Sequence, residues 1–518
     1  MKVSAVALYQ RALWEYIRPY RWLLATLRSV ELLVVIIRFL LIKVPLELIG
    51  SRILHRKSGL FGDDPFTRNS VLRHLLEELG PTFVKLGQIM SMRPEIPKSM
   101  RDDLQKIQER VRPFEFKQVT KVIEKELGKA VDEVFSYVEP TPIAAGSLAQ
   151  VHRAVLRKEG EEVAIKVQRP YLDGIVSLDV LIIQTLFAII WRLMGELRKK
   201  SDVSVFTISF SEHLMMETDF YLEGVYQEKM RELVMADPRH RKYIKIAEVY
   251  WDYTGGKLLT MELVKNYHRM DSPKGSEIIT RVKLPELSPE RPAHLLWAGM
   301  LFYADQLLKW GFLQGDPHWG NIYVTEDEQL FVCDFGMVDV LKDEELDGLL
   351  DIVVSLIWYI SAEKCAKALI SLHKGSTENV RYDDAVVEIR HRLTKRVVRH
   401  QGQENPDIRV KTGEKSLSVL TECLYALAVF GFSLPDTFWL WFKTLLYLEE
   451  WSMLQMTDCN LNDFILPLAK ERMKGRIIRE LAPLDITNID EALAEVAEPL
   501  RDTGMAQLFA SMDKGNTR

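Results

Sequence analysis

The spacing of apolar residues divides the chain into a helical part, a short run of strands and a second, longer helical part. From residue 67 to about 130, apolar residues recur at three- and four-residue intervals, which predicts helices. Between 134 and 167 the pattern changes and indicates consecutive antiparallel strands around two turns. Helical spacing returns from 176 to 233, and strand-like stretches follow at 244–249 and 257–263.

The rest of the chain, from residue 292 onward, is predicted to be almost wholly helical. The exception is the stretch 315–332, where a loop precedes two short strands. A mostly β lobe is therefore followed by a mostly α lobe, which predicts an α+β fold with two lobes. We find no fixed-period repeat and no heptad run long enough for a coiled coil.

The first 60 residues form a basic and apolar segment. They contain ten Lys or Arg residues against three Glu residues, which leaves a net charge of +7. Basic residues interleaved with aromatic and aliphatic ones suit a helix that lies in an anionic membrane interface, and this is the arrangement we expect. Two alternatives stay open: a helix docked on the protein body, and a spanning helix. In the apolar run 30–49, Arg38 would cost a spanning helix about 2.5–3.5 kcal/mol.

Charge and cysteine usage limit the partners and the compartment. The chain has 518 residues with 68 Lys and Arg against 73 Asp and Glu, so its net charge of −5 offers no global attraction to nucleic acid. No cleavable signal pattern is evident, and the scattered cysteines predict buried, reduced thiols. We therefore expect a cytoplasmic protein, peripherally associated with the membrane. The cysteines are Cys333, Cys365, Cys423 and Cys459.

A single lysine ends the strand Val163-Ala164-Ile165-Lys166. Strand alternation places Ala164 and Lys166 on the same face, so the ammonium group can point into a cleft and contact nucleotide phosphates. Four residues are a weak match by themselves, because a surface lysine after a strand is common. The match gains weight from the residues that follow it in the chain.

A second group of polar residues follows the order found in protein kinases. Asp316 and Asn321 have the spacing of a kinase catalytic loop, and Asp334 begins an Asp-Phe-Gly sequence after a strand. Magnesium prefers oxygen ligands, so Asn321 and Asp334 are candidate metal ligands and Asp316 a candidate base. As a tripeptide, Asp-Phe-Gly would more often be an ordinary turn. The lysine strand, the loop and this sequence in the same order make chance a poor explanation.

Two features of ordinary protein kinases are missing. The turn before the lysine strand carries alanines and one glycine where a kinase has a Gly-rich loop, and no Ala-Pro-Glu follows Asp334. A carboxylate partner for Lys166 is expected on the helix between the strand and the loop. The acidic residues there could instead form a solvated helix face. They are Glu212, Glu217, Asp219 and Glu223.

With Lys85-x-Gly87-Gln88 upstream, these departures resemble the UbiB family of atypical kinase-like proteins, also called AarF-type. The resemblance covers about residues 65–450, and the motif is followed by Ser91-x-Arg93-Pro94 and Pro97. It implies a kinase-like two-lobed fold, with a small β-rich N-lobe, a large helical C-lobe and a helical N-terminal extension over the site. The structural alternative is that Gly87 only allows close helix contact.

The resemblance assigns roles to particular residues. It implies catalytic roles for Asp316, Lys166, Glu217, Lys85 and Gln88, and it prefers Glu217 over the other acids as the partner of Lys166. It implies that the metal ligands are Asn321 and Asp334. The nucleotide-binding residues that we assign are Ala144, Ala145, Gly146, Ser147, Lys166 and Glu262.

Four residues depart from the family pattern or need a separate role. Gly146 stands where an alanine is common, which puts the usual nucleotide preference in doubt. Gln314 and Trp319 are also departures, and neither is expected to touch a metal ligand. For His318 a structural role in the loop is favoured over proton transfer, because Asp316 already occupies the position of the base.

The resemblance implies a protein that binds ATP or ADP with Mg²⁺ and is an ATPase or a small-molecule or lipid kinase. Such a protein would support ubiquinone or related isoprenoid-quinone synthesis at the membrane, with prenylated quinone precursors or their enzymes as partners. A nucleotide-sensing scaffold and a protein kinase are the alternatives. We expect segments at 1–60 (membrane interface), 61–133 (extension), 134–265 (N-lobe with a helical insertion), 266–480 (C-lobe) and 481–518 (helical tail).

Overall fold

The computed structural model describes most of the chain between residues 21 and 472. The described residues are 21–45, 68–92, 98–104, 107, 113–193, 211, 214–270, 272–282, 295–318, 320–357, 362–373, 380–399, 434, 436–455, 468 and 471–472. The contacts divide the chain into two compact units. The first comprises Met1–Phe302, Gln314–Asp339 and Trp439–Thr444, and the second comprises Tyr303–Leu313, Val340–Phe438 and Leu445–Arg518. The predicted tail 481–518 lies outside the described residues.

An antiparallel sheet forms where the strand pattern predicts it. Its order is β1-β3-β4-β6, and β2 pairs with β3. Buried residues of β4, such as Val163 and Val167, pack with Val119 and Ile123 of helix α7. Because these buried residues alternate along β4, they lie on one face of the sheet, and this face forms a hydrophobic core with α7. The bounds are β1 (Phe135–Val138), β2 (Ala144–Ala145), β3 (Ala149–Leu156), β4 (Glu162–Gln168), β6 (Leu258–Glu262), α7 (Phe116–Leu127) and α8 (Val131–Val134).

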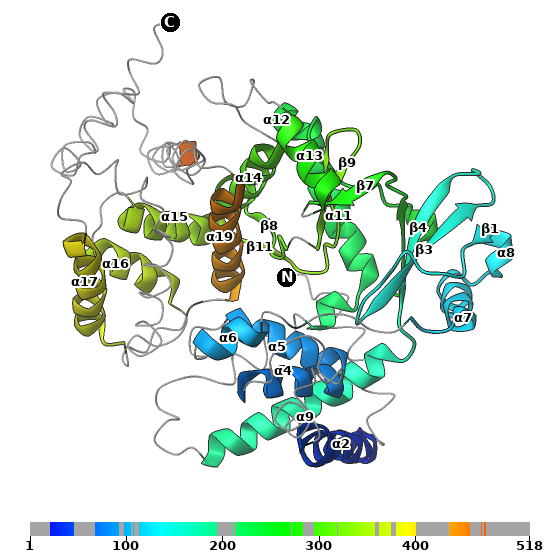
Figure 1. Ribbon diagram of the computed structural model, residues 1–518, viewed down its shortest axis with the longest axis horizontal. Helices are drawn as coiled ribbons and strands as arrows, with labels where there is room; N and C mark the ends of the chain where they lie inside the picture. Colours follow the sequence, from blue (N-terminus) through cyan, green and yellow to red (C-terminus); the bar gives the residue numbers. More distant parts are fainter. Residues whose placement is uncertain are drawn as a thin grey trace, which may run out of the picture. The chain divides into compact units, whose positions relative to one another are not determined.

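Within the predicted extension, 61–133, the residues between 68 and 104 form short helices, and in Figure 1 these lie together with two longer helices, one earlier and one later in the sequence. Apolar residues of these helices form one cluster, in which Leu76, Phe83 and Val180 are buried. At Gly87, an added Cβ would lie 2.4 Å from the Ile107 side chain, so close helix contact does require glycine there. The helices are α2 (Arg21–Arg38), continued by the π-helix η1 (Phe39–Lys43), α4 (Arg68–Leu79), α5 (Pro81–Met92), α6 (Lys98–Leu104) and α9 (Leu172–Leu193).

Helix α2 is docked on this extension by one of its faces. The Arg28 guanidinium pairs with Asp179 of α9 at 2.8 Å, and Asp179 is fully buried. The opposite face stays exposed and carries apolar residues at alternating four- and three-residue steps. We call it the apolar face of α2, consisting of Leu23, Leu27, Val30, Val34 and Ile37 of α2 and Leu41 of its continuation η1. In the described part of the chain, no helix combines the length and the apolar character needed to cross a membrane.

A second sheet supports the loop that carries Asp316 and Asn321. Its order is β5-β10-β9-β7, with β10 parallel to β5 and antiparallel to β9. The hairpin β9–β10 is the pair of short strands predicted after the loop, whereas β7, β8 and β11 were not predicted. The bounds are β5 (Ile244–Lys245), β7 (Tyr267–Arg269), β8 (Phe312–Gln314), β9 (Ile322–Thr325), β10 (Leu330–Val332) and β11 (Val338–Val340).

The remaining elements are mostly helical, as the apolar spacing predicts. In the second unit, Arg472 binds Asp343 at 2.8 Å and Asp347 at 2.9 Å and so ties a late part of the chain to α15. The bounds are α11 (Phe220–Ala236), α12 (Pro238–Arg241), the 3-10 helix η3 (Trp251–Tyr253), α13 (Pro273–Arg281), α14 (Leu295–Asp305), the π-helix η4 (Gln306–Trp310), α15 (Asp343–Ile357), α16 (Ala362–Leu372), α17 (Tyr382–Arg399) and α19 (Asp436–Gln455).

Candidate functional site

Lys166 of β4 is paired with Glu223 of α11. The Lys166 Nζ lies 2.7 Å from Oε1 and 2.9 Å from Oε2 of Glu223. Asp219 fixes the start of α11, because its carboxylate accepts the backbone N–H groups of Tyr221 and Leu222. Glu223 therefore lies in the first turn of this helix, on the side that is buried.

The prediction that Glu217 is the partner of Lys166 is wrong. Glu217 precedes the helix cap at Asp219 and instead pairs with Lys85 of α5, at 3.0 Å. Glu217 and Glu223 are both buried, so the alternative of a solvated acidic face fails for these two residues as well. The sequence has two acids six positions apart, and the cap between them decides which one faces β4.

Burial would lower the pKa of Lys166, but Glu223 and Asp334 outweigh this effect and raise it above its ordinary value. Burial also raises the pKa of Glu223, an effect that Lys166 opposes. With two carboxylates around it, Lys166 is held as an ammonium ion. It therefore has the charge that binding to a phosphate requires.

Asp334 has an unusual backbone conformation for a residue other than glycine, with φ of 69°. Its Oδ1 accepts the Gly336 N–H at 3.1 Å and lies 3.7 Å from the Lys166 Nζ. Burial would raise the pKa of Asp334, but Lys166, Lys85 and the Gly336 N–H lower it. The carboxylate is thus kept ionised, as a metal ligand must be.

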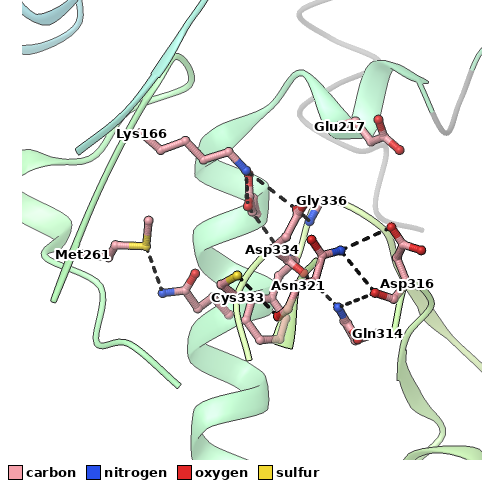
Figure 2. A network of polar contacts seen from close by, with 12 residues as sticks. Lys166, Glu217, Met261, Gln314, Asp316, Asn321, Cys333, Asp334 and Gly336 are labelled. Carbon is pink, nitrogen blue, oxygen red and sulfur yellow. Dashed lines mark hydrogen bonds and ion pairs between the residues drawn. The ribbon is translucent and has the colours of Figure 1, made fainter. Parts of the chain in front are cut away.

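Asn321 closes the catalytic loop on Asp316, and Gln314 ties this loop to Asp334 (Figure 2). The Asn321 Nδ2 donates to the carbonyl oxygen of Asp316 at 3.2 Å and to its Oδ2 at 3.3 Å. The buried Gln314 Nε2 donates to the backbone carbonyl of Asp334 at 3.0 Å. Gln314 was expected to touch no metal ligand. This expectation is wrong, because Gln314 contacts the main chain of Asp334, a candidate ligand. Trp319 lies outside the described residues.

The donor set fits a magnesium ion. Because Nδ2 of Asn321 faces Asp316, its Oδ1 takes part in no hydrogen bond among the described residues. The side chain of Asp334 is 47% exposed, so its carboxylate is open to a ligand. An amide oxygen beside a carboxylate is the oxygen-only set that Mg²⁺ prefers, usually together with phosphate oxygens.

Lys85 brings the extension to this site, as the resemblance implies. Lys85 pairs with Glu217, and its positive charge also contributes to lowering the pKa of both Asp316 and Asp334. Gln88 follows on the same helix, α5, and its carbonyl accepts the Ser91 hydroxyl at 2.6 Å. A chemical role for Gln88 stays a prediction.

The loop predicted to cover the nucleotide forms the hairpin of β2 and β3. Ala144 is exposed and Ala145 and Gly146 are partly exposed, whereas Ser147 is buried. The Arg169 guanidinium donates to the carbonyl of Gly146 at 3.1 Å. Nucleotide contacts by these residues stay a prediction.

Glu262, also predicted to bind the nucleotide, ends strand β6. Its carboxylate pairs with Lys245 at 2.6 Å, and its N–H donates to the carbonyl of Glu248. The side chain is thus engaged by β5 rather than directed at Lys166. Its predicted contact with a nucleotide is untested.

No pattern in the sequence predicts one residue of the site, Lys443 of α19. Its Nζ lies 2.7 Å from Oδ1 of Asp316. Burial would raise the pKa of Asp316, but Lys443 and, after it, Lys85 lower it. His318 accepts the Gly320 N–H at its Nδ1, at 3.0 Å, which agrees with the predicted role in shaping the loop.

Comparisons with known proteins identify relatives of this chain. Residues 106–368 match the family model described as the ABC1 atypical kinase-like domain. An uncharacterized Synechocystis protein is 34% identical over 302 residues, which cover 58% of this chain and 42% of that one. In Arabidopsis thaliana, an uncharacterized chloroplastic aarF domain-containing protein kinase is 35% identical over 291 residues, covering 56% and 38%. The chloroplastic protein Activity of BC1 Complex Kinase 3 is 32% identical over 305 residues, covering 59% and 41%.

The matches cover only part of each relative. This chain spans about two fifths of the length of each of these three proteins. A solved Mycobacterium tuberculosis structure, described as a complex with erythromycin, is 20% identical with a TM-score of 0.38, covering 68% of this chain and 90% of that one.

Proposed function

The chain belongs to the ABC1 atypical kinase-like family, and on this premise we propose that it binds ATP or ADP with Mg²⁺ and catalyses phosphoryl transfer from ATP. The acceptor is water or the hydroxyl group of a small molecule or lipid. Membership confirms the resemblance to the UbiB family and the α+β, kinase-like fold. The activity and the acceptor are our proposal.

One observation carries this proposal: Lys166, Glu223, Asp334, Asn321 and Asp316 form a connected polar group. They come from a strand, a helix and two loops that are far apart in the sequence, and Gln314 links the two loops. A lysine for phosphates, an amide and a carboxylate for a divalent cation, and a second carboxylate for the acceptor are the parts that phosphoryl transfer needs.

Each residue has a role in the proposed step. The bond between the γ-phosphorus and the β,γ-bridging oxygen breaks, a bond from that phosphorus to the acceptor oxygen forms, and ADP leaves. Asp316 takes the acceptor's proton, and Lys166 holds phosphate oxygens. Mg²⁺ held by Asn321 and Asp334 would neutralise charge on the phosphates.

The acceptor side of the site favours a small acceptor over a protein. Lys85 of the extension pairs with Glu217 and acts on the pKa of Asp316, so α5 lies close to the position of the base. A protein hydroxyl would have to come within about 3–3.5 Å of the γ-phosphorus past this helix. We therefore keep water, a metabolite or a lipid as acceptors and place a protein kinase last.

The names of relatives and an exposed helix face bear on the pathway and its location. Relatives named after the activity of the bc1 complex, together with the UbiB resemblance, support a role in isoprenoid-quinone synthesis at a membrane. The apolar face of α2 supports the membrane location, because an exposed stripe of this length is typical of a helix bound at an interface. The prenylated precursors themselves, or their enzymes, would be the partners.

Labelled ATP tests the activity. Protein is incubated with Mg²⁺, ATP labelled at the γ-phosphate and a membrane extract, and the label is followed. Label in a lipid or metabolite would identify a kinase, and free labelled phosphate alone would identify an ATPase. Asp334→Asn removes one carboxylate charge from the metal site, so we expect at least about tenfold less product from it. Nucleotide binding without any transfer would instead support the scaffold.

Serine substitutions on the apolar face of α2 test the membrane location. Leu27→Ser, Val34→Ser and Leu41→Ser together remove exposed apolar surface and leave the Arg28–Asp179 contact in place. We expect at least about tenfold weaker co-sedimentation with vesicles that contain anionic phospholipid. Val387→Ser, at an exposed apolar position of α17, is the matched control. Unchanged sedimentation of the triple variant would refute the membrane contact through this face.

A further inference from the structure

We propose that Lys443 binds the γ-phosphate of ATP beside Asp316. It would thereby place a positive charge next to the candidate base, where the acceptor binds. This inference deepens the proposed function and rests on it. Its basis is the 2.7 Å ion pair between the Lys443 Nζ and Oδ1 of Asp316. Lys443 lies beyond residue 368, where the match to the family model ends.

The catalytic loop has no cation of its own. The sequence from Asp316 to Asn321 is Asp-Pro-His-Trp-Gly-Asn, without lysine or arginine. Phosphoryl transfer concentrates negative charge on the oxygens of the γ-phosphate, and fixed cations there are a main source of catalysis. Lys85 pairs with Glu217 and Lys166 with Glu223. Lys443 is the cation paired with the candidate base itself.

The position of Lys443 is fixed by packing against the same loop. A Cβ added at Gly315 would lie 2.1 Å from Cγ of Leu440, so helix α19 lies directly against the residue before Asp316. Leu440 and Lys443 are three positions apart and therefore on the same side of the helix. Trp441 and Thr444 are fully buried and hold this turn in place. The packing of α19 against the loop therefore determines where the ammonium group of Lys443 lies.

The ion pair is open to a ligand. The side chain of Lys443 is 18% exposed and that of Asp316 is 32% exposed, so both side chains can be reached from solvent. An ammonium ion is a compact charge on a flexible stem, which allows it to contact a carboxylate and a phosphate in the same place. A buried structural ion pair would lack this access.

Nucleotide affinities test the assignment on the full chain. Lys443→Met removes the charge and keeps the length of the side chain. We expect about tenfold weaker binding of Mg²⁺ with the β,γ-imido analogue of ATP and unchanged binding of Mg²⁺ with ADP, because only the former has a γ-phosphate. Calorimetric titration gives both affinities without turnover. Lys443→Arg should keep the wild-type ratio of the two affinities.

Two controls separate this effect from damage to the fold. Lys229→Met removes an exposed lysine of α11 that pairs with Glu232 on the surface, and it should leave both affinities unchanged. Gly315→Ala should displace Leu440 and reproduce the loss for the ATP analogue, whereas Gly315→Ala with Leu440→Ala should restore it. Circular dichroism reports whether each variant folds.

The outcomes are distinct. A wild-type ratio of affinities in Lys443→Met would overturn the assignment, even if its turnover fell, because a lysine that only positions Asp316 does not sense the γ-phosphate. Loss of both affinities in a folded Lys443→Met would overturn it as well. Wild-type protein that binds neither nucleotide would refute the proposed function first, and the inference with it.

Discussion

Glu223→Gln is expected to lower the rate of phosphoryl transfer by about 100- to 1,000-fold. The substitution leaves Lys166 without its closest carboxylate, at 2.7 Å, and with Asp334 at 3.7 Å. The ammonium group then moves toward Asp334, which the metal ion also needs. Glu223 and Asp334 together keep the pKa of Lys166 above its ordinary value, so loss of the Glu223 carboxylate lowers the pKa of Lys166.

The change at Lys166 can be measured directly. An amine-reactive reagent, followed by mass spectrometry of peptides, should label Lys166 several-fold faster in Glu223→Gln, because more of the amine is uncharged. Glu217→Gln should speed labelling of Lys85, its observed partner, and leave Lys166 unchanged. Glu232→Gln, at an exposed site on the same helix, is the control. Faster labelling of Lys166 in Glu217→Gln would favour the pairing first expected from the sequence.

Arg28→Ala is expected to destabilise the helical extension by about 3–5 kcal/mol. Asp179 is fully buried and would keep its negative charge without the guanidinium that lies 2.8 Å away. Hydrogen exchange of the α9 amides, read by mass spectrometry, should become about 100- to 4,000-fold faster.

A double replacement tests this explanation. Arg28→Met with Asp179→Leu removes both charges and keeps apolar volume, so it should recover most of the protection. Lys229→Ala, which breaks an exposed pair on α11, should have an effect below about 1 kcal/mol. Protection in Arg28→Ala equal to that of the wild type would mean that α2 is not held on α9 by this contact.

Features encoded within a few neighbouring residues could be predicted from the sequence. The alternation along β4 and the spacing from Asp316 to Asn321 placed Lys166, the loop and Asp334 in their correct elements. Of the strands with two or three residues, β5 and β10 fall in stretches that were predicted to be strand-like, whereas β7, β8 and β11 could not be found, because so short a stretch has no period of its own to detect. Their pairing depends on contacts with distant residues.

The errors in the site have the same origin. Choosing between Glu217 and Glu223 required knowing that Asp219 caps α11, since the cap determines which acid faces β4. Lys443 joins Asp316 from 127 positions later in the chain, and a lysine in an apolar helix carries no local sign of such a partner. The docked face of α2 likewise depends on Asp179, far along the chain.

The left-handed backbone of Asp334 limits which inactive protein is a fair comparison. With φ of 69°, this position favours glycine, asparagine and aspartate, and other side chains would add strain of about 1–2 kcal/mol. Alanine at this position would therefore remove the carboxylate and distort the turn at once. Its loss of activity would not separate chemistry from shape. Asparagine tolerates the conformation and changes the charge alone, so a catalytically dead form meant to keep its shape in cells should be Asp334→Asn.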